Sequence, residues 1–220
     1  MSFRKKIEYL VLKYLAVPKT PKVEDNRKHI ACLGDSITFG AGVSGKKEKT
    51  WEYFLEEKLN GEYQVLNYGI SGRTLQDEGD YPYKADKFYQ ISKDLKADIY
   101  LIMLGSNDAK PYNWNEERYE KQLDRFVSEY MDLSEKSEVI LMSPPSCFVD
   151  RKTGVVGFDI DMKNVDGPIY RIVKDTAERK GLKMIDLHEF TSGHEDWFVD
   201  GVHPNELGNR KIAEYICENL

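Results

Sequence analysis

The chain has 220 residues, of which 40% are hydrophobic and 32% are charged. This length suits one large domain, and the hydrophobic content is enough for a core but too low for membrane spans. The formal charge of −6 argues against a nucleic-acid partner, because binding to the phosphate backbone requires a basic surface. The three cysteines form no CxxC pair, which favours a reducing compartment. We therefore expect a cytoplasmic protein with a single main domain.

The first residues of the chain carry both basic and apolar side chains. Three basic residues, at positions 4–6, are typical of a signal peptide, but Glu8 and Lys13 interrupt the apolar stretch that such a peptide needs. The apolar residues instead share one helical face: Phe3, Ile7, Leu10, Val11, Tyr14 and Leu15. We predict that residues 1–27 form an amphipathic helix and a polar connector before a domain of residues 28–220. The helix would pack on the domain or make peripheral contact with a membrane or partner.

Strands and helices are expected to alternate along the rest of the chain. Apolar runs predict strands at residues 29–33, 63–68, 98–104, 138–142 and 182–187. Helical periodicity is found at residues 51–59, 83–96, 119–130, 169–180 and 204–219. This order predicts an α/β fold, a three-layer α/β/α sandwich around a mainly parallel five-stranded sheet. Residues 147–167 lack periodicity and are expected to form a long loop or lid.

Four short polar segments occur at the predicted element ends. They are residues 34–38 (GDSIT), 67–72 (NYGISG), 105–108 (GSND) and 200–204 (DGVHP). Three of them follow strands, and the fourth precedes the last helix. In an open parallel sheet, ligands bind where the carboxyl ends of the strands give way to loops. We therefore expect the four segments to converge on one crevice.

These segments contain the groups needed for nucleophilic catalysis. The hydroxyl of Ser36 is a poor nucleophile until a base takes its proton, and His203 is a candidate base. Asp200 can orient the imidazole, which completes a Ser/Asp/His triad. A tetrahedral intermediate also needs donors for its negative charge, and the N–H groups of Gly72 and Ser36 and the Asn107 amide are candidates. Each motif alone is equally typical of a turn or a helix cap, but their joint order favours a hydrolase.

Together the four segments resemble the blocks of the SGNH hydrolases, also called GDSL-type esterases. The second block extends to residue 74, and the resemblance spans residues from about 28 to the C-terminus. It implies a flavodoxin-like fold, Ser36 as nucleophile, Asp200 and His203 as the other triad members, and an oxyanion hole of Ser36, Gly72 and Asn107. Ile37 stands where the family's name-giving pattern has leucine. No cofactor is implied.

Other patterns point to different functions. Residues 40–45 (GAGVSG) fit a dinucleotide-binding fingerprint, but they begin well past the strand end and a lysine-rich stretch follows in place of a helix. The spacings of His29, His188 and His194 match no metal site, so we expect no metal. Binding of a ligand without cleavage, and acyl transfer to an alcohol other than water, remain alternatives.

The substrate prediction depends on aromatic residues that adjoin the motifs. We expect these rings to border the crevice and contact substrate: Tyr81, Tyr83, Tyr112, Trp114 and Trp197. Aromatic faces mixed with Asn and Asp suit a sugar ring better than a long acyl chain. The preferred substrate is thus a small molecule with an O-acyl ester, foremost an O-acetyl ester, on a carbohydrate. Hydrolysis of lysophospholipids or acyl thioesters is the alternative that the N-terminal helix favours.

Overall fold

The computed structural model describes residues 18–24, 26–43, 47–150 and 154–220. The predicted N-terminal helix therefore lies outside the described residues. Part of the connector runs along the edge of the domain, where Gln64 accepts a hydrogen bond from the backbone N–H of Glu24 at 2.9 Å. The Gln64 amide also donates to the carbonyl of Lys22 at 2.8 Å. The connector is thus joined to the second strand.

The centre of the domain is a five-stranded sheet in which each pair of neighbouring strands is parallel. The strands are β1 (Lys28–Gly34), β2 (Tyr63–Gly69), β3 (Ile99–Met103), β4 (Glu138–Met142) and β5 (Lys183–Ile185), in the order β2-β1-β3-β4-β5. Every residue of β3 is buried, which explains its unbroken apolar sequence, because a parallel strand is covered on both faces. The predicted parallel sheet is confirmed.

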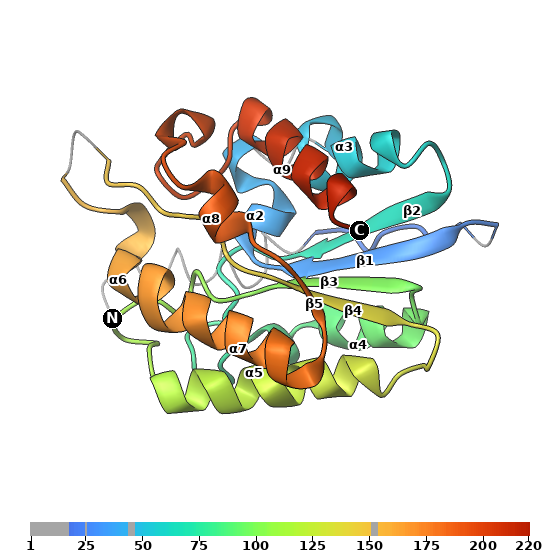
Figure 1. Cartoon of the computed structure of the whole chain (residues 1–220), viewed down its shortest axis with the longest axis horizontal. Helices are drawn as coiled ribbons and strands as arrows, with labels where there is room; N and C mark the ends of the chain where they lie inside the picture. The colour runs from blue at the N-terminus through green and yellow to red at the C-terminus, as the bar shows by residue number, and fades with distance from the viewer. Residues whose placement is uncertain (1–17, 25, 44–46, 151–153) are drawn as a thin grey trace.

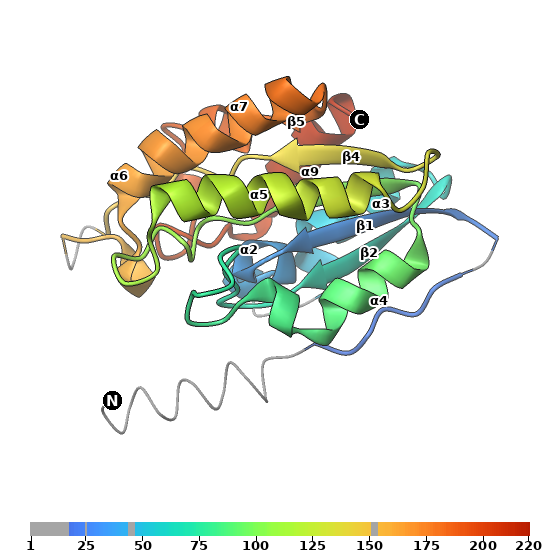
Figure 2. The same cartoon turned by 90° about the horizontal axis from the view of Figure 1, so that it is seen from below.

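Helices cover both faces of this sheet, as Figures 1 and 2 show. On one face lie α4 (Lys87–Leu95), α5 (Glu116–Met131) and α7 (Tyr170–Lys180), and on the other lie α3 (Trp51–Lys58) and α9 (Glu206–Glu218). The shorter helices are α2 (Ser36–Phe39), α6 (Met162–Asn164) and α8 (Leu187–Thr191). The arrangement confirms the predicted three-layer α/β/α sandwich. Within the described ranges, each helix is too short or too polar to cross a membrane.

The core is divided into two halves by the sheet. Along β1, Ala31 and Leu33 belong to the half beneath α4, α5 and α7, whereas Ile30 and Cys32 belong to the half beneath α3 and α9. This division follows from the alternation of side chains along a strand. Both faces of the sheet are thus covered by apolar side chains, and the polar motif segments lie at the strand ends.

The prediction that residues 147–167 form a long loop is wrong for its last part. Met162–Asn164 form α6, and a π-helical turn over Val165–Ile169 connects it to α7. Pro168 lies inside this turn, where its missing N–H and its ring do not fit the hydrogen-bond pattern of a regular α-helix. The wider turn lets the chain enter α7 without a break.

Candidate active site

Ser36 lies at the first position of α2, two residues after β1 ends. Asp35 is the N-cap of this short helix, and its Oδ1 accepts a hydrogen bond from the backbone N–H of Ile37 at 2.9 Å. The first N–H groups of a helix have no acceptor within the helix, so the Ser36 N–H is available to a ligand. In Figure 2 the strand β1 points toward α2, which places Ser36 at the carboxyl edge of the sheet.

Two glycines allow α2 to pack directly on the strand ends. A Cβ atom at Gly34 would lie 2.1 Å from Oγ1 of Thr38, and one at Gly69 would lie 2.3 Å from the backbone nitrogen of Phe39. Both separations are far below van der Waals contact. The glycine of the GDSIT segment is therefore required by close packing beneath the serine.

The three residues of the predicted triad form one chain of hydrogen bonds. His203 Nε2 lies 2.8 Å from Ser36 Oγ, and His203 Nδ1 lies 2.8 Å from Asp200 Oδ2. The second oxygen of Asp200 accepts backbone N–H groups from Val202 at 3.0 Å and from His203 at 2.8 Å. Residues that are 167 positions apart in the sequence are thus brought into direct contact.

The surroundings of Asp200 keep it ionised. Burial favours the neutral acid, but the hydrogen bond and charge of His203, together with the two backbone N–H groups, outweigh it and lower the pKa of Asp200. A carboxylate beside Nδ1 holds the ring proton there and leaves Nε2 as the acceptor. His203 is therefore oriented to take the hydroxyl proton of Ser36.

Gly201 permits the tight turn between Asp200 and His203. Its φ angle is 80°, and a Cβ atom there would lie 2.2 Å from the carbonyl oxygen of Phe148. The backbone N–H of Phe148 donates to the carbonyl of Gly201 at 2.8 Å. The turn is thus held against the chain that follows β4.

The two other predicted oxyanion donors lie on loops that adjoin Ser36. Gly72 has a φ angle of 81°, in the left-handed region that favours glycine, and its loop is joined to the β1 end by a hydrogen bond from Ile70 N–H to Gly34 carbonyl at 3.1 Å. The Asn107 amide donates to Asp35 Oδ2 at 3.3 Å. Both loops are therefore attached to residues that directly precede the serine.

Asp108 has a role that no sequence pattern indicates. It is fully buried, and its two carboxylate oxygens accept the backbone N–H groups of Leu75 at 2.8 Å and Gln76 at 2.9 Å. Burial raises the pKa of Asp108 to about 7, against the opposing effect of these hydrogen bonds. The sequence is also compatible with Asp108 as the N-cap of the following helix, but Asn115 is the N-cap of α5. Asp108 instead joins the Gly72 loop to the Asn107 loop.

A buried polar network continues this connection. The amide of Asn113 donates to the carbonyl of Asn107 at 2.9 Å, and its oxygen accepts from the N–H of Asp80 at 3.0 Å. The carbonyl of Asn113 accepts from the Gln76 side chain at 3.0 Å. Lys110, only 7% exposed, pairs with Asp80 at 3.7 Å. Polar side chains thus fill the space between these two loops.

Two of the predicted aromatic contacts are buried in the structure. Tyr83 has no exposed surface, and its hydroxyl donates to the carbonyl of Tyr68 at 2.9 Å, so it belongs to the core and not to a crevice wall. Trp197 is 8% exposed and is stacked against His194 with ring centroids 3.7 Å apart. Tyr83 therefore does not face a substrate. Contact of Trp197 with a substrate stays a prediction, because the proposed base His203 is equally buried.

The other three aromatic candidates differ in exposure. Tyr112 is 58% exposed. Tyr81 is half-buried, with the Arg73 guanidinium 5.9 Å from its ring centroid. Trp114 packs against the core and against Tyr119, with ring centroids 5.6 Å apart. Contact of these three rings with a substrate stays a prediction.

Phe158 is an aromatic residue at the site that the sequence did not reveal. Its ring lies 4.8 Å from the imidazole of His203, with the two planes at 79°. It belongs to a segment without periodicity, and no motif adjoins it in the sequence. Only the folded chain places it beside the triad.

In the described residues, both competing sequence patterns are engaged in contacts with the rest of the domain. Gly42, from the glycine-rich segment, packs against the loop of His203, since a Cβ atom there would lie 2.1 Å from the Pro204 carbonyl oxygen. His29 bonds to the carbonyl of Glu24, and His188 to the carboxylate of Asp166. In the part of the chain that the structure describes, no three His, Cys, Asp or Glu side chains gather as a metal site.

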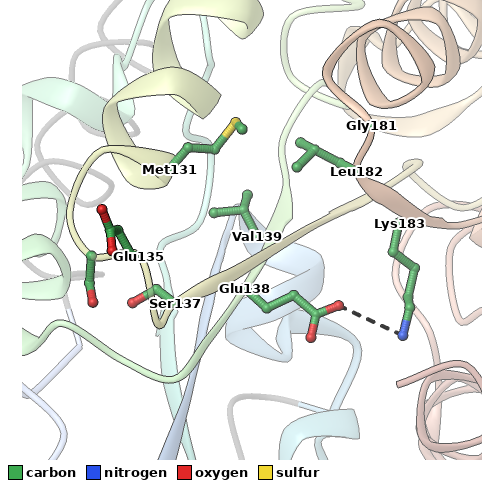
Figure 3. Close-up of a pocket in the computed structure, with 9 residues that line it drawn as sticks. Met131, Glu135, Ser137, Glu138, Val139, Gly181, Leu182 and Lys183 are labelled. Carbon is green, nitrogen blue, oxygen red and sulfur yellow. Dashed lines mark ion pairs between the residues drawn. The ribbon is translucent and has the colours of Figure 1, made fainter.

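A separate hollow of about 260 Å³ lies at the opposite edge of the sheet (Figure 3). It is bordered by Met131 at the end of α5 and by the first residues of β4 and β5, where Glu138 and Lys183 form an ion pair at 3.7 Å. Because it lies at the amino ends of these strands, it is remote from the triad at their carboxyl ends.

Comparisons with known proteins agree on one family. The family model described as "GDSL-like Lipase/Acylhydrolase family" matches residues 32–211. An acetylxylan esterase from Xylanibacter ruminicola is 30% identical over 216 residues, which cover 90% of this chain and 44% of that protein. A multidomain esterase from Ruminococcus flavefaciens is 27% identical over 219 residues, covering 86% and 28%. The chain thus spans less than half the length of these two relatives.

Solved structures share the fold. A carbohydrate acetylesterase from Sinorhizobium meliloti has a TM-score of 0.68 at 18% identity, covering 87% of this chain and 97% of its own. The native aryl esterase of M. smegmatis has a TM-score of 0.67 at 21% identity, covering 88% and 100%. At these identities the likeness shows the α/β/α architecture alone.

Proposed function

Because the chain belongs to the GDSL-like lipase/acylhydrolase family, we propose that it is a serine esterase that cleaves a small O-acyl ester, foremost an O-acetyl ester on a carbohydrate. One observation carries this proposal above all. It is the unbroken chain of 2.8 Å contacts from Asp200 through His203 to the hydroxyl of Ser36. Such a chain turns an unreactive hydroxyl into a nucleophile.

The proposed reaction has two halves. Ser36 Oγ attacks the ester carbonyl carbon while His203 Nε2 takes the hydroxyl proton, and the tetrahedral intermediate then collapses as the same nitrogen gives the proton to the departing alcohol. This leaves an acyl-serine. In the second half, His203 takes a proton from water as the water oxygen attacks the acyl-serine, and it gives this proton to Ser36 Oγ as the bond to the acyl carbon breaks and the acid is released. Asp200 stays ionised and stabilises the imidazolium that forms in each half.

The oxyanion is the second requirement of this mechanism. The negative charge on the former carbonyl oxygen would be met by the N–H groups of Ser36 and Gly72 and by the Asn107 amide. Preorganised donors contribute most when they need not move during the reaction. The hydrogen bonds that Asp108 accepts from the Gly72 loop, next to Asn107, support such preorganisation.

Two observations support a short acyl group on a sugar. An acetylxylan esterase is 30% identical to this chain. The loops that would flank the acyl group are packed with buried polar residues, among them Asn107, Lys110 and Asn113. A groove for a long acyl chain needs apolar walls instead.

A substrate panel tests the proposal. The purified chain should hydrolyse p-nitrophenyl acetate and acetylated xylo-oligosaccharides, and activity should fall steeply as the acyl chain of the p-nitrophenyl ester is lengthened. Ser36→Ala is the control and should be folded but inactive, without the added acetyl mass seen on the wild type in rapid-quench mass spectrometry. A preference for long acyl chains would favour a lipid or thioester substrate, and a transferred acyl group in the presence of added alcohol would favour an acyltransferase.

A further inference from the structure

Phe158 has two features that are unfavourable for folding stability: a left-handed backbone conformation and an exposed apolar side chain. Its φ and ψ angles are 64° and 26°, in the left-handed region, and Asp159 follows with a φ angle of 59°. Non-glycine residues avoid this region because the Cβ atom crowds the backbone, and a large aromatic residue is unusual there. The residue is also 54% exposed. Folding stability alone does not explain an exposed ring at a strained position, and such residues gather at functional sites.

The chain around Phe158 is fixed on both sides of the triad. Ile160 is buried in the core, and the N–H of Asp161 donates to the carbonyl of Ala109, two residues beyond Asn107. The Asn164 amide donates to the same carbonyl at 3.0 Å. On the other side, a Cβ atom at Gly157 would lie 3.6 Å from the Asp200 carbonyl oxygen. Phe158 is therefore held between the loop of Asn107 and the loop of Asp200.

This placement sets the ring beside the path of the leaving alcohol. In the proposed mechanism the departing oxygen takes its proton from His203 Nε2, so the alcohol part of the ester lies within hydrogen-bond reach of that atom. The centroid of the Phe158 ring is 4.8 Å from that of the imidazole. Phe158 is 54% exposed, so a ligand bound at the triad can reach it.

Resting on the proposed function, we propose that Phe158 is the stacking surface for the alcohol part of the ester, a sugar ring bound next to the scissile bond. A pyranose presents apolar C–H groups on its faces, which suit an aromatic ring, and hydroxyl groups on its edges. The exposed carboxylate residue Asp159 follows directly and adds a polar neighbour. Phe158 thus favours esters whose alcohol part is a sugar, whatever their acyl group.

The test compares two acetate esters that share the acyl group and differ in the alcohol. Acetylated methyl xyloside carries a sugar ring, and ethyl acetate carries none. Phe158→Leu, which keeps apolar bulk without the flat faces, should lower kcat/KM for the sugar ester about 3- to 10-fold, the range for one lost ring contact, mainly through KM. The value for ethyl acetate should change less than about 2-fold. Phe158→Tyr should behave as the wild type.

Val155→Ala is the matched control, because Val155 is 60% exposed on the same segment and should leave both esters unaffected. Binding of unacetylated xylotriose, followed by calorimetry, should weaken in Phe158→Leu by the same factor as KM rises. An equal loss of kcat/KM for both esters would mean that the ring supports the His203–Asp200 pair and does not contact the alcohol, which would overturn the proposal. An unchanged kcat/KM for both esters would overturn it as well. A wild type inert toward both esters would instead overturn the proposed esterase function itself.

Discussion

The substitution Asp108→Asn tests how the two oxyanion loops are held together. Asparagine keeps the size of the side chain but has a single acceptor oxygen for two backbone N–H groups, those of Leu75 and Gln76. Both oxygens of a carboxyl group keep a lone pair for these N–H groups even when the group is protonated, whereas an amide nitrogen cannot accept. A buried N–H without an acceptor costs about 1–3 kcal/mol. We therefore expect the variant to be less stable than the wild type by about this amount at acidic pH, and to have a lower kcat because the Gly72 loop is less firmly fixed.

The pH dependence of this difference can be worked out from the structure. Burial raises the pKa of Asp108 from its ordinary value of 3.8 to about 7. Between these two values the folded protein holds a proton that the unfolded chain has released, so the contribution of Asp108 is complete below about pH 4 and declines as pH rises to about 7. At 1.36 kcal/mol per pKa unit, the total decline is about 4 kcal/mol, of which about 2–3 kcal/mol falls between pH 5 and pH 8.

Urea unfolding of both proteins at pH 5 and pH 8 measures this directly. Asparagine does not titrate, so the stability difference between wild type and variant should shrink by about 2–3 kcal/mol at the higher pH. Asp94→Asn, at an exposed carboxylate on α4, is the control and should show no such change. A difference that stays constant or widens at pH 8 would mean that the two N–H bonds outweigh burial and that the pKa of Asp108 is not raised.

Three further substitutions have defined outcomes. Asn107→Ala should lower kcat about 10²- to 10³-fold in steady-state assays with p-nitrophenyl acetate, because one oxyanion donor is lost, and an unchanged kcat would exclude that role. Gly201→Ala should lower both kcat and the thermal midpoint, because the φ angle of Gly201 is 80° and an added Cβ atom would lie 2.2 Å from the carbonyl oxygen of Phe148. A variant as active and stable as the wild type would contradict this close packing. Phe158→Gly should reduce activity on acetylated xyloside without lowering the thermal midpoint, because glycine relieves the left-handed backbone. A clear fall in that midpoint would instead make the ring a stability element.

The strands and the motif residues could be predicted because their signals are local. A buried parallel strand such as β3 must be apolar along its whole length, so residues 98–104 identify it without any partner. Since parallel strands end at the same edge of the sheet, the segments after them were expected to meet. The 2.8 Å contact between Ser36 and His203 agrees with that expectation.

Exposure could not be predicted in the same way. Tyr83 and Tyr112 have the same local signal, an aromatic residue shortly after a polar motif, yet one is fully buried and the other is 58% exposed. The difference arises because the hydroxyl of Tyr83 reaches the carbonyl of Tyr68 across the core. Burial of a single side chain depends on which distant elements pack over it, and short sequence patterns do not contain that information.

The order of strands and helices, the glycine-containing turns and the chemical groups of the triad can be predicted from the amino-acid sequence, because each follows from hydrophobic periodicity or from residue type at a strand end. Two other features emerge only in the folded chain: Asp108 joins two loops through residues 32 and 33 positions away, and Phe158 lies against His203. Contacts of this kind depend on how separate elements pack in three dimensions, so they are fixed by the fold as a whole and leave no local pattern in the chain.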